Sequence, residues 1–359
     1  MLSGLFENWI VNLHVGLKLA IYVVGLAVGI FCLVKFCDIF VDGASVIAKK
    51  LKIPPLIIGL TVVAMGTSLP ELAVSISDSI DVLIGGSNAN VAIGNVVGSN
   101  ICNILLVLGL SVIFTPIALK RSVYKRELPI LLGVTAIVAL LICLFGINSA
   151  ASLNDLAVTR WEGIILVVIM VGYITYIVWM AKKHPDQLDE VEAVTVDMPL
   201  WKAILLVVLG GVGIFLGGQL VEFGAKGLAL QGAEALKIDH DMAEALVGLT
   251  IVAVGTSLPE LVTSCIAAKK GENEIAVGNV IGSNMFNMLF VMGIASIVAP
   301  LTIGSQVIVD VAVMLVSTTL LLVFAQKGKL TRAHGIVFVC LYGVYLTYLV
   351  LRTVLGWTF

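Results

Sequence analysis

Charged side chains are scarce in this sequence of 359 residues. Asp, Glu, Lys and Arg together make up 12% of it, whereas hydrophobic residues make up 60%. A soluble globular domain carries about 25% charged residues, so this composition excludes a water-soluble globule. Several apolar runs reach the roughly 20 residues that a helix needs to cross a hydrocarbon core about 30 Å thick. The sequence therefore predicts a protein embedded in a lipid bilayer.

Several kinds of functional motif are also missing. The sequence has no GxxxxGK[ST] nucleotide loop and no EF-hand loop, and its net charge of −2 gives no sign of nucleic-acid binding. The six cysteines form no paired motif, and we expect them to be small buried hydrophobes. We therefore expect no enzymatic activity, no resident cofactor, no nucleic acid and no nucleotide among the partners.

The apolar runs between polar breaks predict ten membrane spans. These spans cover residues 15–46, 55–79, 90–114, 127–147, 161–181, 200–231, 243–268, 275–299, 306–325 and 333–355. Of the 21 Lys and Arg residues, 14 fall on the odd-numbered connections. Because cytoplasmic loops collect Lys and Arg, we expect those connections in the cytoplasm and both termini outside. The protein is then a multi-pass plasma membrane protein, which in a prokaryote means the cytoplasmic, or inner, membrane.

The chain contains an internal repeat. Residues 54–76 (PPLIIGLTVVAMGTSLPELAVSI) match residues 243–265 (AEALVGLTIVAVGTSLPELVTSC), and residues 92–109 match residues 276–293. Because each unit has five spans, an odd number, the second copy enters the membrane from the opposite side. Secondary transporters often have such inverted repeats, with the substrate site where the repeats meet.

The expected fold is an all-α polytopic membrane protein with ten transmembrane helices arranged as two inverted five-helix repeats. The first repeat covers residues 1–183 and the second covers 200–359. Between them, residues 184–199 form a cytoplasmic acidic linker, which we interpret as a solvated connection rather than a regulatory cation sensor.

The GTSLPE motif, present in both halves, brings oxygen atoms together within an apolar segment. Pro70 has no N–H, so the carbonyl of Gly66 loses its helical partner. The side chains of Thr67, Ser68 and Glu71 share one helix face. The second copy repeats this arrangement with Thr256, Ser257 and Glu260. Carboxylate, hydroxyl and carbonyl oxygens are the ligands that a hard cation prefers.

A second repeated motif, GN(V/I)(V/I)GSN, adds neutral oxygen donors. Its polar residues recur at intervals of four, as Asn95, Ser99 and Asn103 and again as Asn279, Ser283 and Asn287. The GxxxG spacing within it lets helices approach closely. Neither motif segment contains a Lys or Arg to offset its glutamate, and a charge at mid-bilayer costs about 2.5–3.5 kcal/mol on insertion scales. A mobile cation is the expected partner of the two glutamates.

GTSLPE followed by GN(V/I)(V/I)GSN in both halves resembles the alpha repeats of the cation/Ca2+ exchanger superfamily, in its Na+/Ca2+ exchanger branch. The resemblance implies electrogenic antiport, with spans one and six sliding to switch access and with Glu71 and Glu260 as the central carboxylates. It further implies cation sites lined by Thr67, Ser68, Thr256, Ser257 and the carbonyls of Ala64 and Ala253, and completed by Ser99, Asn103, Ser283 and Asn287.

One position departs from the family pattern, because many Na+/Ca2+ exchangers carry Asp where this chain has Asn287. The site then has two formal negative charges, which one Ca2+ can balance. This leaves the coupling ion and the stoichiometry open, and it argues against the K+-dependent branch. Na+ is favoured over H+ because the proton-coupled branch usually has a GN-type motif before its glutamate.

The favoured function is secondary antiport of Ca2+ against Na+ by a protein that we expect to be a monomer. Exchange of Ca2+ or another divalent cation against H+ stays open as an alternative. A cation channel, or an intramembrane enzyme with Glu71 and Glu260 as a carboxylate pair, is disfavoured but not excluded.

Overall fold

The computed structural model describes residues 13–84, 90–145, 157–183, 198–235, 253–303 and 306–355, and these are nearly all helical. In the first half the helical elements are α2 (Val15–Leu51), α3 (Pro55–Ile58), η1 (Gly59–Val63), α4 (Ala64–Thr67), α5 (Leu69–Leu83), α6 (Asn90–Cys102), η2 (Asn103–Leu108), α7 (Gly109–Phe114), η3 (Val123–Glu127), α8 (Leu128–Leu140), η4 (Leu141–Phe145) and α10 (Arg160–Lys183), where η marks a π-helical turn. In the second half they are α11 (Leu200–Ala235), α13 (Ala253–Thr256), α14 (Leu258–Lys269), α15 (Asn273–Phe286), η8 (Asn287–Val291), α16 (Met292–Val298), α17 (Gln306–Ala325) and α18 (Arg332–Leu355).

The membrane-spanning character of the chain is confirmed. In the described part of the chain, eight helices are long and apolar enough to cross a membrane, and the bent pair Pro55–Thr67 and Leu69–Leu83 makes a ninth span. The remaining predicted span, 243–268, is the seventh in chain order and begins outside the described residues. Nearly all of the linker 184–199 also lies outside them. The count of ten therefore stays a prediction.

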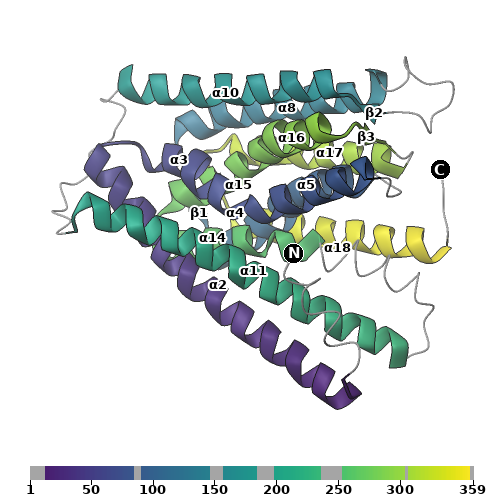
Figure 1. Cartoon of the computed structure of the whole chain (residues 1–359). Coiled ribbons are helices and arrows are strands. Elements are labelled where there is room, and N and C mark those ends of the chain that lie inside the picture. The colour runs from purple at the N-terminus through teal and green to yellow at the C-terminus, as the bar shows by residue number, and fades with distance from the viewer. Residues whose placement is uncertain are drawn as a thin grey trace.

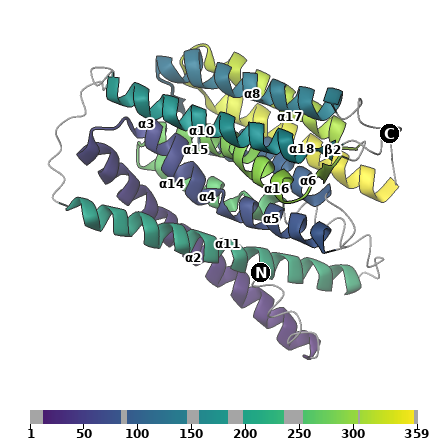
Figure 2. The same cartoon turned by 45° about the horizontal axis from the view of Figure 1, so that its top comes forward.

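Two helices are longer than the sequence pattern predicted. Helix α2 has 37 residues and helix α11 has 36. At 1.5 Å per residue each is about 55 Å long, well beyond a hydrocarbon core of about 30 Å. Figures 1 and 2 show the two helices lying side by side along one edge of the molecule. Glycines permit this close packing, since a Cβ at Gly29 would lie 2.7 Å from the backbone nitrogen of Val221.

Both GTSLPE motifs break the helix that contains them. Helix α4 ends at Thr67 and α5 starts at Leu69, with a bend of 47° between the two helical pieces. Ser68, at the break, has φ −87° and ψ 12°, and Ser257 has nearly the same backbone, with φ −86° and ψ 1°. The proline that follows each serine lies in the first turn of the new helix, where it needs no N–H partner. Each half therefore starts a new helix just before its glutamate.

Two features were absent from the sequence-based prediction. Equivalent π-helical turns begin at Asn103 and Asn287, so both of these predicted site residues lie where the helical hydrogen-bond pattern changes. The structure also contains two antiparallel strand pairs, β1 (Ile117–Ala118) with β4 (Lys329–Leu330) and β2 (Ala157–Val158) with β3 (Leu301–Thr302). These two-residue strands join connections that the sequence showed only as polar breaks.

The glycines of the second GNxxGSN motif bring the two halves into close contact. A Cβ at Gly282 would lie 2.5 Å from the carbonyl oxygen of Leu60 and 2.7 Å from Cβ of Ala64, and one at Gly278 would lie 2.7 Å from the carbonyl oxygen of Leu56. Helix α15 therefore packs with backbone contact against α3, η1 and α4 of the first half. The predicted role of this GxxxG pair is confirmed.

We expect Gly282→Ala to lower the thermal stability of the purified protein. The added methyl group collides with backbone atoms that cannot rotate away, and such overpacking typically costs about 1–3 kcal/mol. Gly172→Ala is the matched control, because Gly172 is exposed on α10 and no described residue lies within 4 Å of its Cβ position. Equal unfolding temperatures for the two variants would contradict the assigned contact.

Candidate cation site

Two fully buried carboxylates lie at the centre of the candidate site. Glu71 and Glu260 are both 0% exposed, and each lies in the first turn of the helix that follows a GTSLPE break. The N-terminal end of a helix favours a negative charge by about 0.3–1 kcal/mol, so the two breaks place each carboxylate where the backbone partly stabilises it.

The protein leaves most of the carboxylate oxygens without a partner. Glu260 Oε1 accepts hydrogen bonds from Ser68 Oγ at 2.8 Å and from Ser283 Oγ at 3.4 Å. Among the described residues, no hydrogen-bond partner exists for Oε2 of Glu260 or for either carboxylate oxygen of Glu71. A buried anion without compensation is strongly unfavourable, so these oxygens indicate a site for a cation or a proton.

The predicted hydroxyl residues come together from the two halves of the chain. Thr67 Oγ1 lies 3.4 Å from Ser283 Oγ, and Ser99 Oγ lies 3.5 Å from Thr256 Oγ1. Together with the bond from Ser68 to Glu260, these contacts each join one repeat to the other. All the hydroxyl residues named in the prediction are buried, namely Thr67, Ser68, Ser99, Thr256, Ser257 and Ser283.

The two predicted amide ligands, Asn103 and Asn287, are both buried but differ in their contacts. Asn103 donates from Nδ2 to Asn284 Oδ1 at 3.2 Å, which leaves its own Oδ1 without a partner in the described structure. Neither amide atom of Asn287 has such a partner there, although the residue is 0% exposed. Among the predicted ligands, the buried side-chain oxygens that no described group satisfies are thus Glu71 Oε1 and Oε2, Glu260 Oε2, Ser257 Oγ, Asn103 Oδ1 and Asn287 Oδ1. Ca2+ takes six to eight oxygen ligands, so this donor set suits it.

The two predicted carbonyl ligands, those of Ala64 and Ala253, differ from the side-chain ligands in what the structure shows of them. The carbonyl of Ala64 already accepts from the backbone nitrogen of Ser68 at 3.0 Å and from Thr67 Oγ1 at 3.3 Å. A cation there would share the oxygen or displace the threonine hydroxyl. Ala253 is the first residue of α13, at the edge of the described chain, and no contact of its carbonyl is described.

Sequence reasoning missed several buried polar partners of the site. Asn284 accepts from Asn103 and donates from Nδ2 to the carbonyl of Asn100 at 3.5 Å. Ser75 and Ser264, at equivalent positions of the two halves, accept hydrogen bonds from Asn95 and Asn279 at 3.0 Å. The signal was present, since the last asparagine of GSN and the serine four residues after each glutamate occur in both copies.

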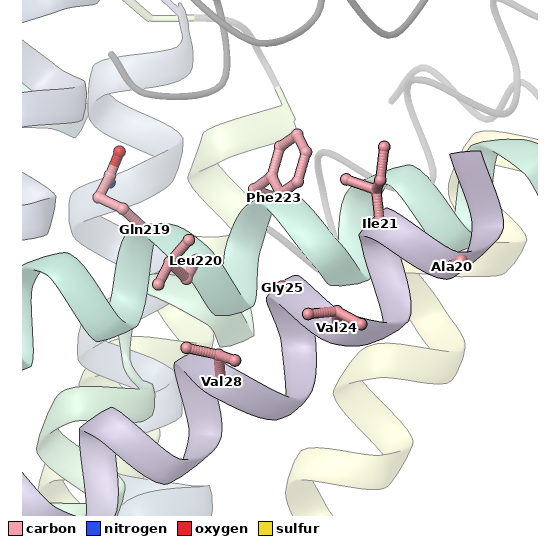
Figure 3. Close-up of a pocket in the computed structure, with 8 residues that line it drawn as sticks. All are labelled: Ala20, Ile21, Val24, Gly25, Val28, Gln219, Leu220 and Phe223. Carbon is pink, nitrogen blue, oxygen red and sulfur yellow. The ribbon is translucent and has the colours of Figure 1, made fainter. Parts of the chain in front are cut away.

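A separate groove lies between α2 and α11, away from the polar cluster. It has a volume of about 420 Å³ and is lined mainly by apolar side chains, among them Val24 and Val28 of α2 and Leu220 and Phe223 of α11. Figure 3 shows these side chains along the crossing of the two helices. Gln219 is the one polar side chain among its eight lining residues, and the groove has no carboxylate, so it does not suit a cation.

Comparisons with known proteins identify related sequences and a related structure. A sequence model of the family described as "Sodium/calcium exchanger protein" matches residues 21–179 and 202–351. The chain is 32% identical over 357 residues to the sodium/calcium exchanger MaX1 of Methanosarcina acetivorans, covering 90% of this chain and 97% of that protein. It is 34% identical over 286 residues to the inner membrane protein YrbG of Escherichia coli K12, covering 77% and 79%. The solved structure of the sodium-calcium exchanger NCX_Mj superposes with a TM-score of 0.74 at 30% identity, covering 92% of this chain and 99% of that one.

We expect Glu71→Gln and Glu260→Gln to fold but to lose stabilisation by Ca2+. A ligand at 100 times its dissociation constant stabilises the native state by about 2.7 kcal/mol, and most of this gain should vanish when one carboxylate is gone. Without ions the variants should be as stable as the wild type or more so, because a neutral amide costs less to bury than a charge. Thermal unfolding with and without Ca2+ measures both effects. Glu234→Gln, at an exposed position on α11, is the control, and unchanged Ca2+ stabilisation in either site variant would exclude that glutamate from the site.

Proposed function

The chain belongs to the sodium/calcium exchanger family, and on that premise we propose that it is a secondary active antiporter that exchanges Ca2+ for Na+ by alternating access. Membership makes it an integral membrane transporter of the cation/Ca2+ exchange type rather than an enzyme. The observation that carries the finer proposal is the pair Glu71 and Glu260, buried at the meeting of the two halves with three of their four carboxylate oxygens unpartnered in the described structure.

The charge of the site explains why two different cations would compete for it. One Ca2+ balances the charges of Glu71 and Glu260, and the surrounding hydroxyl and amide oxygens complete its coordination without adding charge. Na+ prefers the same oxygen donors but carries half the charge, so several Na+ ions must spread over the cluster. Because Ca2+ and Na+ need the same carboxylates, binding of one ion displaces the other, and exchange requires this competition.

The proposed change of access is supported by an ion cluster at one end of α2, which we call the α2–α14 ion cluster. Lys270, just after α14, lies 2.6 Å from Asp38 Oδ1 and 2.6 Å from Asp42 Oδ1 of α2. Burial alone would lower the pKa of Lys270, but its hydrogen bonds to the two carboxylates outweigh burial and raise that pKa, so Lys270 stays charged at neutral pH. Nearby, Lys49 pairs with Glu272 at 3.4 Å.

The opposite end of the site cannot be closed by the same ion pairs. Residues 40–48 (FVDGASVIA) resemble residues 220–229 (LVEFGAKGLA), so the equivalent of Asp42 is Glu222 on α11. The two GTSLPE copies are 189 residues apart, and at this offset the equivalent of Lys270 is Asp81 at the end of α5. Two acids replace an acid and a base, so the two ends of the site differ in what holds them shut. We propose that α2 and α11 move together against the rest of the molecule and that the α2–α14 ion cluster holds the predicted cytoplasmic end closed.

Flux measurements in liposomes test the proposed function directly. Protein reconstituted in liposomes loaded with Na+ should accumulate radioactive Ca2+ from a Na+-free medium, and liposomes loaded with K+ should not. An imposed pH gradient without Na+ should give little uptake, and reconstituted Glu71→Gln protein serves as the inactive control. Uptake driven by the pH gradient alone would favour the H+-coupled alternative, and uptake that needs no ion on the opposite side would indicate a channel.

We expect the Asn287→Asp variant to exchange Ca2+ with a steeper dependence on pH than the wild type. The new carboxylate, when ionised, attracts every cation loaded in the cluster. The proposed site places it beside two other carboxylates, however, and like charges favour its protonation as the pH falls. Na+-driven Ca2+ flux between pH 5 and 8 should therefore diverge most from the wild type at acidic pH. Superimposable pH profiles would place position 287 outside the cation cluster.

We expect Lys270→Gln to open the predicted cytoplasmic end more often. The two partly exposed ion pairs of Lys270 contribute about 0.2–1 kcal/mol each, so the loss of both should raise the open population about 2- to 30-fold. Cys37, which is fully buried on α2 and accepts from Thr263 Oγ1 at 3.1 Å, reports this opening. The measurement is the rate of maleimide labelling of Cys37 in a chain whose other cysteines are replaced. Lys327→Gln, which removes an exposed base from another connection, should leave the rate unchanged, and equal rates for both variants would contradict the assigned role.

A further inference from the structure

Two asparagines outside the predicted ligand set make equivalent contacts in the two halves. Asn95 and Asn279 follow the first glycine of each GNxxGSN motif, and they are 8% and 0% exposed. Asn95 donates from Nδ2 to the backbone carbonyl of Glu71 at 3.1 Å, and Asn279 donates to that of Glu260 at 3.4 Å. Each asparagine therefore holds the backbone of one central glutamate.

These donor bonds fix the orientation of each amide. A carbonyl oxygen only accepts hydrogen bonds, so the side-chain atom that faces it must be the NH2 group. The second proton of Asn279 Nδ2 points to Ser264 Oγ at 3.0 Å. Both donors of Asn279 are thus used within its own half, and its Oδ1 is left facing the other half.

The free oxygen of Asn279 accepts the shortest hydrogen bond of Thr67. Thr67 Oγ1 donates to Asn279 Oδ1 at 3.0 Å, whereas its contacts with the Ala64 carbonyl and Ser283 Oγ measure 3.3 and 3.4 Å. A hydroxyl has one proton and two lone pairs. If the proton goes to Asn279, both lone pairs of Thr67 are available to a cation.

The other half does not make the equivalent contact. Asn95 holds Glu71 in the same way, but its Oδ1 has no hydrogen-bond partner among the described residues. The two halves therefore differ at this point while sharing every donor bond of the asparagine. Asn95 serves as an internal reference for Asn279, because it has the same chemistry without the threonine bond.

From these contacts we propose that Asn279 is a positioning residue for cation binding, an inference that rests on the proposed function. It binds no ion itself. Its Oδ1 accepts the hydrogen bond of the Thr67 hydroxyl, so that the lone pairs of that hydroxyl turn toward the cation, and its Nδ2 holds the backbone of Glu260 in the same network. One amide thus couples a hydroxyl of the first half to the carboxylate of the second, which lets a bound cation draw the two halves together.

A double-mutant cycle tests this proposal. Thr67→Val removes the hydroxyl at nearly constant volume, and Asn279→Ala removes its acceptor. We expect each single change to raise the apparent dissociation constant for Ca2+ about 10-fold, in the range for loss of a buried hydrogen bond. Because Asn279 acts through Thr67, adding Asn279→Ala to Thr67→Val should raise it less than about 3-fold further. The reference cycle, Thr67→Val with Asn95→Ala, should instead show effects that multiply.

The readout is the rise in unfolding temperature with Ca2+ concentration in purified protein, which requires binding but no transport. Multiplicative effects in the Asn279 cycle, equal to those in the Asn95 cycle, would overturn the proposal. If Asn279→Ala does not fold, Asn279→Ser enters the same cycle, since its shorter side chain withdraws the acceptor from Thr67. Failure of both variants to fold even in saturating Ca2+ would make Asn279 a purely structural residue and would also overturn the proposal.

The same measurement separates this inference from the proposed function. A wild-type protein that is stabilised by Ca2+ and by Na+ but shows no coupling between Thr67 and Asn279 retains its function and loses only the positioning role. A wild-type protein that responds to neither ion has no cation site of the kind proposed, and the function and the inference then fail together.

Discussion

The uncompensated charge of two glutamates within the membrane is the constraint on which the rest of the structure depends. Glu71 and Glu260 are fully buried, and the described protein offers them hydroxyl groups and helix ends but no hydrogen bond to three of their four oxygens. Removing a carboxylate from water costs several kcal/mol even after relaxation, so such a pair persists only with a counter-charge. In the proposed function the counter-charge is the transported ion, and loading the site makes the buried state favourable.

The fold supplies the geometry that this constraint requires. The break at Ser68 and its counterpart at Ser257 give each half a fresh helix start, directed at its own glutamate. Gly278 and Gly282 bring α15 into backbone contact with the first half, so that the carboxylate of Glu260 comes within reach of the Ser68 hydroxyl. The long helices α2 and α11 lie to one side of the site. Lys270 ties α2 to the core through Asp38 and Asp42, an arrangement that suits the proposed movement of the pair past a fixed site.

The local sequence pattern predicted the spans and the helix breaks, whereas the contacts that depend on tertiary pairing were not predicted. Apolar runs located the spans, and Pro70 and Pro259 marked the breaks, because both signals act within one segment. The length of α2 was underestimated because its last turn carries Lys49 and Lys50, and the predicted spans were limited to apolar residues. Basic side chains nevertheless stabilise the C-terminal end of a helix, so α2 continues through them. The bond from Thr67 to Asn279 was not predictable, since the register between helices of different halves is set by close packing and not by the motifs themselves.

The most direct test of a cation held between the two halves is to locate one. Crystals of the purified protein soaked in Sr2+, a heavier stand-in for Ca2+, would show the ion by anomalous scattering. The account predicts a peak within coordination distance of oxygens from both Glu71 and Glu260, which disappears when both are replaced by Gln. A peak bound by one half alone, or no peak in the cluster at Sr2+ concentrations that block Ca2+ transport, would contradict it.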